Sequence, residues 1–167
     1  ATERYIARAS TAAKQGADEV WCVDTNPNAI KCAKKNIGQN LTRAQAKHTK
    51  FIFKKSDLFS GISKKIRFNV IIFNPPYVPS ETVQWNDTDG GKKGRETLDL
   101  FLDSFENFLA PKGTVYFLQS SLNGILITQK KLQKMGFIPE IIGRQKLFFE
   151  ELLVFKAVKK IEPKKYF

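Results

Sequence analysis

A run of four apolar residues followed by Asn-Pro-Pro-Tyr constrains the fold of this 167-residue chain more than any other feature. The run is Val70-Ile71-Ile72-Phe73, and an unbroken series of β-branched and aromatic residues predicts a strand buried on both faces, as in a parallel sheet. Asn74-Pro75-Pro76-Tyr77 then lies at the carboxyl end of that strand, where open α/β sheets place their ligands.

The two prolines of this tetrapeptide stiffen the backbone and remove N–H groups. The stretch would therefore present carbonyl oxygens, the Asn74 amide and the Tyr77 ring to a ligand. Such a rim suits an –NH2 group, since two acceptors take its hydrogens while a ring covers its plane. The alternative is an ordinary strand-ending turn, for which Asn-Pro is common punctuation.

Strand and helix patterns alternate along the chain until the last two strand-like stretches, which have no helix pattern between them. The patterns predict helices over residues 4–15, 29–40, 96–109 and 125–135, and strands over 19–24, 51–53, 70–73, 114–118, 137–142 and 147–158. This order predicts a single α/β domain over residues 1–167, a doubly wound and mostly parallel sheet with an antiparallel last strand. We expect residues 159–167 to form a tail.

Composition and charge exclude some classes of protein and favour others. The chain is 42% hydrophobic and 26% charged, as in ordinary globular domains, and no apolar run approaches the roughly 20 residues that span a bilayer. Cys22, Cys32 and His48 cannot build a zinc site by themselves, so we expect no metal and a reducing, cytoplasmic location. The net charge of +12 favours polyanionic partners without identifying nucleic acid as a substrate.

Acidic residues follow the two strands that precede the tetrapeptide. Asp24, with Thr25 beside it, ends a strand where an acid can accept hydrogen bonds from both hydroxyls of a nucleotide ribose. A turn residue before the next helix is the alternative role. Asp57 would accept from an adenine amino group while Leu58 packs on the ring, although Ser-Asp is also common in turns.

These motifs, in this order, resemble those of the class I S-adenosylmethionine-dependent methyltransferases. The resemblance rests on Val-Asp at a strand end, then Ser-Asp-Leu, then Phe-Asn-Pro-Pro-Tyr. Within that superfamily the chain is similar to the HemK-type release-factor glutamine methyltransferases. Two further stretches indicate the archaeal and eukaryotic branch, namely Gly90-Gly91-Lys92-Lys93-Gly94-Arg95-Glu96 and Gly143-Arg144-Gln145.

The resemblance implies a seven-stranded type of sheet and a set of site residues. The family's first strand and Gly-rich loop should precede Ala1-Thr2-Glu3-Arg4-Tyr5, so we expect the amino terminus of the domain to be incomplete. S-adenosylmethionine would be held by Asp24, Thr25, Asp57, Leu58 and Asn74. Catalysis would use Asn74, Pro75, Pro76 and Tyr77, and a substrate loop would include Gly91, Gly94 and Arg95.

The reaction that the resemblance implies is N5-methylation of the glutamine in a Gly-Gly-Gln motif of a peptide-chain release factor. Asn74 and the Pro75 carbonyl would accept the two amide hydrogens and aim the nitrogen lone pair at the methyl group. Two alternatives stay open. One is N-methylation of a base amino group in RNA or DNA, which the charge would suit. The other is a non-catalytic, methyltransferase-like binding module.

Phe51-Ile52-Phe53 points to a partner, because it is short and apolar and belongs to the outer edge of the sheet in this topology. The resemblance supplies a small zinc-binding activator subunit that adds a strand to this edge. The alternative is that a helix of the same chain shields the face of the strand and leaves its edge bare. We expect no membrane association.

Overall fold

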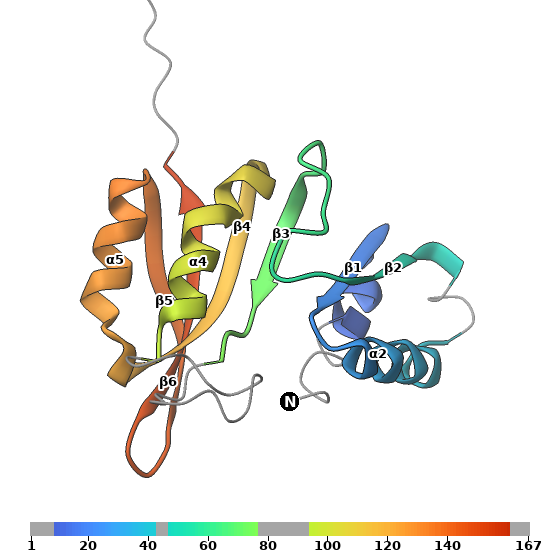
Figure 1. Ribbon diagram of the computed structural model, residues 1–167, viewed down its shortest axis with the longest axis horizontal. Coiled ribbons are helices and arrows are strands. Elements are labelled where there is room, and N and C mark those ends of the chain that lie inside the picture. The colour runs from blue at the N-terminus through green and yellow to red at the C-terminus, as the bar shows by residue number, and fades with distance from the viewer. Residues whose placement is uncertain (1–8, 43–46, 77–93, 161–167) are drawn as a thin grey trace, which may run out of the picture. The chain divides into compact units, whose positions relative to one another are not determined.

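The computed structural model describes residues 9–42, 47–76 and 94–160. The chain forms two compact units, Ala1–Ser63 and Lys64–Phe167 (Figure 1), and each is considered by itself. The elements in chain order are β1 (Glu19–Asp24), α2 (Pro27–Asn40), β2 (Lys50–Lys55), β3 (Phe68–Phe73), α4 (Glu96–Ser104), a 3-10 turn (Phe105–Phe108), β4 (Leu109–Ser120), a second 3-10 turn (Ser121–Asn123), α5 (Ile125–Lys134), β5 (Phe137–Lys146) and β6 (Glu151–Lys159). No helix in the described ranges has the length and apolar character that crossing a bilayer requires.

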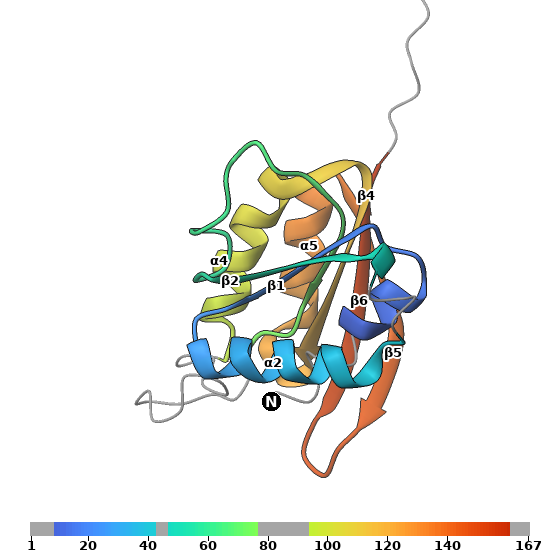
Figure 2. The same ribbon diagram turned by 90° about the vertical axis from the view of Figure 1, so that its right-hand side faces the viewer.

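The first unit is built on a parallel pair of strands. β1 and β2 run in register from Glu19 opposite Lys50 to Asp24 opposite Lys55, and α2 packs against both strands (Figure 2). The helix begins at Pro27, two residues before the predicted start, because the side chain of Asn26 accepts the N–H of Asn28 at 2.9 Å and a proline occupies the first turn.

The second unit is a four-stranded mixed sheet in the order β3-β4-β6-β5. β3 and β4 are parallel, whereas β6 is antiparallel to both β4 and β5. α4 and α5 lie side by side on one face of this sheet (Figure 1), and Lys131 on α5 pairs with Asp103 on α4 at 2.8 Å. The predicted α/β sheet with an antiparallel last strand is confirmed.

The core of the second unit is aromatic and lies between the sheet and these two helices. Phe101 of α4 stacks on Phe73 of β3 at 4.3 Å between ring centroids, and Phe117 stacks on Phe155 of the neighbouring strand at 5.1 Å. Phe101, Phe117 and Phe155 are each at most 1% exposed. Burial of rings of this size dominates the stability of a small core.

Two details of the sequence prediction are wrong. Val70 and Ile72 are 52% and 46% exposed, because they lie on the face of β3 opposite Ile71 and Phe73, and it is the Phe73 face that packs on Phe101 of α4. The last strand begins at Glu151 rather than at residue 147, because a hydrogen bond from the Leu147 N–H to the Glu150 carbonyl (2.8 Å) closes a loop between β5 and β6.

One end of the described chain agrees with the sequence prediction, and the other departs from it. Residues 9–14 are helical, as predicted, and Gly16 follows with a φ of 85°, the left-handed conformation of a helix C-terminus. Lys159 is the last residue of β6, and the Lys160 N–H donates to the Gly136 carbonyl at 2.8 Å. The sheet therefore holds the first residues of the stretch predicted as a tail, and residues 161–167 lie outside the described ranges.

Candidate active site

The first unit brings the two predicted cofactor-binding acids to the carboxyl ends of neighbouring strands. Asp24 is the last residue of β1, and its carbonyl accepts the N–H of Ser56 at 3.0 Å. Asp57 follows directly, just beyond the end of β2. Because β1 and β2 are parallel, both acids lie at the carboxyl end of the strands, which is the ligand-binding end of such sheets.

The Asp24 carboxylate has one oxygen committed to the protein and one available. Its Oδ1 accepts the N–H of Asn26 at 2.7 Å, which shapes the turn into α2. Its Oδ2 has no hydrogen-bond partner within the described ranges, and the side chain is half-buried while Thr25 is exposed. The two roles considered from the sequence are therefore compatible, because Asp24 forms the turn and still offers an acceptor to a ligand hydroxyl.

The turn after β2 holds Leu58 in an unusual backbone conformation, with a φ of 45°. Buried Ser56 supports it, because its Oγ donates to the Leu58 carbonyl at 3.0 Å and accepts the N–H of Gly61 at 2.7 Å. A Cβ at position 61 would lie 3.0 Å from the Ser56 side chain, so glycine fits best there. Strain of this kind costs on the order of 1–3 kcal/mol and concentrates at ligand sites. Sequence reasoning included Ser56 only as the first residue of the Ser-Asp-Leu motif, and it missed Gly61.

The second unit carries Asn74-Pro75-Pro76 at the carboxyl end of β3. Phe73, directly before it, is fixed by its stacking on Phe101. Pro75 is buried, and the Oδ1 atom of Asn74 is also buried without a hydrogen-bond partner in the described residues. A buried amide oxygen left unpaired costs about 1–3 kcal/mol, so it is an acceptor that an incoming N–H group would satisfy.

Gly94 and Arg95, both predicted in a substrate loop, are anchored inside the second unit. The Gly94 carbonyl accepts a hydrogen bond from the side chain of Asn123. Arg95 is 7% exposed, and its guanidinium donates to both carboxylate oxygens of Asp99 at 2.7 Å. It also donates to the carbonyls of Asn123 (2.6 Å) and Gly124 (3.2 Å). These bonds from Arg95 hold the pKa of the Asp99 carboxyl below its usual value.

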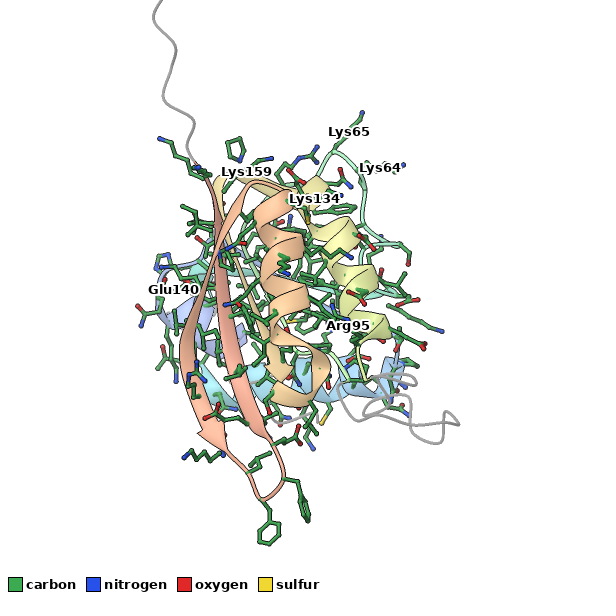
Figure 3. All side chains as sticks on the ribbon, turned by 90° about the vertical axis from the view of Figure 1, so that its left-hand side faces the viewer. Lys64, Lys65, Arg95, Lys134, Glu140 and Lys159 are labelled. Atoms are coloured by element: carbon green, nitrogen blue, oxygen red, sulfur yellow. The ribbon has the colours of Figure 1, made fainter. Side chains whose placement is uncertain are left out.

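Arg95 is therefore an internal clamp that ties the start of α4 to the start of α5 (Figure 3). Sequence reasoning missed Asp99 and Asn123, the partners of this clamp. The dipeptide Asn123-Gly124 after a predicted strand is a turn signal that could have indicated them. Two other predicted site residues, Tyr77 and Gly91, lie outside the described residues.

The predicted site residues thus fall into two groups, one at the carboxyl ends of the strands of each sheet. Asp24, Thr25, Asp57 and Leu58 belong to the first unit, and Asn74, Pro75, Pro76, Gly94 and Arg95 belong to the second. That residues of both groups hold one cofactor stays a prediction. Across the parts of the chain that the structure describes, no group of three or more His, Cys, Asp or Glu side chains could hold a metal ion.

Comparison with known proteins identifies the family. A family model described as the methyltransferase small domain matches residues 5–122. The chain belongs to the methyltransferase small domain family. This membership implies S-adenosylmethionine as the methyl donor, and it confirms the methyltransferase class that the strand-end motifs predicted.

Relatives of this methyltransferase carry names from glutamine methylation. A Methanocaldococcus jannaschii protein with the provisional name protein N5-glutamine methyltransferase is 43% identical over 151 residues, covering 87% of this chain and 72% of its own. A release factor glutamine methyltransferase of Leptospira interrogans is 33% identical over 93 residues, covering 52% of this chain and 29% of its own.

A solved structure confirms the methyltransferase fold. It is the E. cuniculi Mtq2–Trm112 complex, described as responsible for the methylation of the eRF1 translation termination factor. The match has a TM-score of 0.57 and 24% sequence identity, and it covers 95% of this chain and 94% of that chain. At that identity the likeness concerns the fold alone.

Proposed function

We propose that this methyltransferase transfers a methyl group from S-adenosylmethionine to the side-chain amide nitrogen of a glutamine, in the Gly-Gly-Gln motif of a peptide-chain release factor. The observation that carries the proposal is the Oδ1 of Asn74 at the carboxyl end of β3, which is buried and has no hydrogen-bond partner in the described part of the chain. The names of the M. jannaschii and L. interrogans relatives support the glutamine as the acceptor.

The chemistry asks for positioning more than for a strong base. S-adenosylmethionine, when bound, supplies an electrophilic methyl group on its sulfonium. An amide nitrogen is a weak nucleophile because its lone pair is delocalised into the carbonyl. Acceptance of one N–H by Asn74 Oδ1 and of the other by the Pro75 carbonyl would orient that lone pair, and orientation of this kind is worth about 7–11 kcal/mol of a barrier. Tyr77 would cover the amide plane, and the displaced proton would leave to water.

The first unit offers groups that fit the donor. The available Oδ2 of Asp24 suits a ribose hydroxyl, and Thr25 lies beside it. Asp57 is exposed past the end of β2, and the backbone of Leu58 is held in its strained conformation by buried Ser56. We assign Asp57 to the adenine amino group and Leu58 to the face of the adenine ring.

The proposal includes a small zinc-binding activator subunit that adds a strand to β2. Within the described part of the first unit, β2 pairs with β1 and with no other strand. Phe51 and Phe53 lie on the same face of β2 with their ring centroids 6.3 Å apart, and both rings and Ile52 are only partly buried. An apolar edge strand of this kind is an aggregation hazard unless something covers it.

Methylation of a base amino group in RNA or DNA is the second candidate, favoured by the net charge of +12. A third possibility is a non-catalytic binding module that keeps the methyltransferase fold but does not bind the cofactor. Calorimetric titration with S-adenosylmethionine separates the third from the others, because a module without cofactor gives no binding heat. Transfer of labelled methyl groups to a release factor or to RNA separates the first two.

Asn74→Ala is the direct test of the catalytic rim. With a release factor as substrate, we expect the rate of methyl transfer to fall by about two orders of magnitude or more, because one oriented acceptor is lost at the reacting nitrogen. The dissociation constant for S-adenosylmethionine should stay within severalfold of the wild-type value. Mass spectrometry of the Gly-Gly-Gln peptide measures the transfer.

Asn69→Ala is the matched control, since Asn69 is an exposed asparagine on the same strand. We expect this variant to methylate at the wild-type rate. Near-normal turnover by Asn74→Ala would contradict the assignment of Asn74. A wild-type protein that methylates RNA and leaves the release factor unmodified would contradict the proposed substrate.

A further inference from the structure

The hairpin between β5 and β6 ends in two exposed phenylalanines. Phe148 and Phe149 are 92% and 84% exposed, and their rings contact each other edge to face at 4.7 Å between centroids. The bond from the Leu147 N–H to the Glu150 carbonyl closes the loop on either side of them. Two-residue hairpin tips favour glycine, asparagine and aspartate, so local turn chemistry does not explain this pair.

The pair also contributes little to the packing of the fold, because almost all of its surface is in contact with solvent. Two adjacent, largely exposed aromatic rings lower solubility, and apolar surface of this kind usually marks an interaction site. Large rings on a short, hydrogen-bonded turn lose little conformational entropy when a partner covers them. The exposed rings of the hairpin tip are therefore open to contact with a partner.

The strand register places this tip beyond the carboxyl ends of β3 and β4, at the end of the sheet that carries Asn74. Ser120 at the end of β4 pairs with Leu152, and the Glu151 N–H donates to the Ser121 side chain at 3.0 Å. The hairpin continues past that level, and it extends beyond the ends of β3 and β4 in Figure 1. The aromatic tip and the proposed acceptor for the glutamine amide thus lie at the same end of one sheet.

The same register gives an estimate of the distance between the hairpin tip and Asn74. Phe73 is level with Phe117 on β4, which is level with Phe155 on β6. At about 3.3 Å per residue and about 4.8 Å per strand, the tip lies roughly 17 Å beyond the level of Asn74 and about 10 Å to the side. A ligand that touches both points must span about 20 Å, a distance suited to a folded protein and too large for a free amino acid or a nucleobase.

We propose that Phe148 and Phe149 dock the protein substrate, by inserting into an apolar pocket on its surface at this distance from the methylated glutamine. The proposal rests on the proposed function, since it names a second contact of the same substrate. Charged side chains around the tip would form the polar rim of the contact. Arg144 pairs with Glu151 at 2.9 Å across the hairpin, and Lys146 is exposed beside them.

The test compares F148A/F149A with the wild-type full-length protein, using an intact release factor as substrate. We expect KM to rise by about 10-fold or more, as for loss of an aromatic anchor, with kcat at saturation little changed. The dissociation constant for S-adenosylmethionine and the melting temperature should be unchanged. F148Y/F149Y keeps both rings and should keep KM near the wild-type value.

Ile138→Ala is the matched control, because Ile138 is 53% exposed and lies at the opposite end of the same hairpin. It should leave KM unaltered. A wild-type KM in F148A/F149A overturns the inference, including the case in which that variant instead loses self-association in size-exclusion chromatography or binding to lipid vesicles. A wild-type protein that does not methylate the release factor overturns the proposed function and this inference together.

Discussion

Asp24 and Asn74 each present an oxygen that no described residue binds, but the two side chains differ in what else they hold. The Oδ1 of Asn74 is buried without a partner among the described residues, so its substitution tests a ligand contact. Asp24 also holds the turn to Asn26 through its own Oδ1 at 2.7 Å, so its removal disturbs the backbone as well. An interpretable experiment at Asp24 must separate these two roles.

We predict that Asp24→Ala weakens S-adenosylmethionine binding by about 1.5–3 kcal/mol, the worth of hydrogen bonds to a charged group. Titration calorimetry on the full-length protein measures this. Asp24→Asn separates the roles, because its amide oxygen can still accept from Asn26 while the charge is lost. An Asp24→Ala dissociation constant equal to that of the wild type would refute the ribose assignment.

Among the elements, the junction of α4 and α5 depends on buried polar contacts as well as on apolar packing. Arg95 holds Asp99 on its own helix and two carbonyls at the start of α5. Lys131 of α5 donates to the Asp99 carbonyl at 3.3 Å and pairs with the exposed carboxylate of Asp103 at 2.8 Å. The Arg95–Asp99 pair is more buried than the Lys131–Asp103 pair, so it should contribute more to the free energy of unfolding.

We predict that Asp99→Asn lowers the free energy of unfolding by about 1–2 kcal/mol near neutral pH, since Arg95 is buried and Asp99 only partly so. Arg95 lowers the pKa of Asp99 in the folded state, so this contribution is present above the carboxyl's ordinary pKa of 3.8 and is lost as pH falls towards the lower, folded-state value. Urea unfolding should therefore show a difference from wild type that is constant above about pH 5 and shrinks in acid.

Asp103→Asn is the control, because its pair is exposed, and it should lower the free energy of unfolding by under about 1 kcal/mol. Equal costs at the two positions would contradict the clamp.

The edge strand β2 supplies a second prediction at the level of elements. Ile52→Asp places a charge in the middle of the proposed interface, so it should abolish co-purification with the activator subunit. The chain expressed alone should be poorly soluble or weakly active, and co-expression should rescue both. Ile127→Asp, at a 58% exposed isoleucine of α5, is the control and should leave co-purification intact. A chain that is monomeric, monodisperse and fully active by itself would show the partner proposal to be wrong.

For the molecule as a whole, charge and the proposed substrate point to different partners. The 28 Lys and Arg residues exceed the 16 Asp and Glu residues by 12, enough to attract any polyanion. Attraction alone supplies non-specific binding, and it carries no information about which nitrogen is methylated. Binding to RNA and methylation of RNA must therefore be measured separately.

We predict that the protein binds unstructured RNA at low salt and loses at least about 10-fold in affinity between 50 and 200 mM salt, because counterion release drives the association. No methyl group should be transferred to that RNA. Filter binding measures the first result, and incorporation of labelled methyl groups measures the second. Methylation of RNA at a rate comparable to that of the release factor would move the function to a base methyltransferase.

The sequence alone determined the strand ends that carry the chemistry. Apolar runs and the short motifs after them are local signals, so Asp24, Asp57 and Asn74 could be placed at carboxyl ends, and the family could be indicated, without long-range information. The antiparallel last strand was predictable for the same reason, since no helical period separates the final two strands.

The tertiary structure alone decided which side chains are satisfied and which are free. Arg95 was expected at the substrate, yet its carbonyl partners Asn123 and Gly124 lie 28 and 29 residues away along the chain. Phe148 was read as part of a strand, and only the register of β5 with β6 placed it at an exposed tip. Hydrogen-bond partners and burial depend on contacts between distant segments, and local periodicity does not encode those contacts.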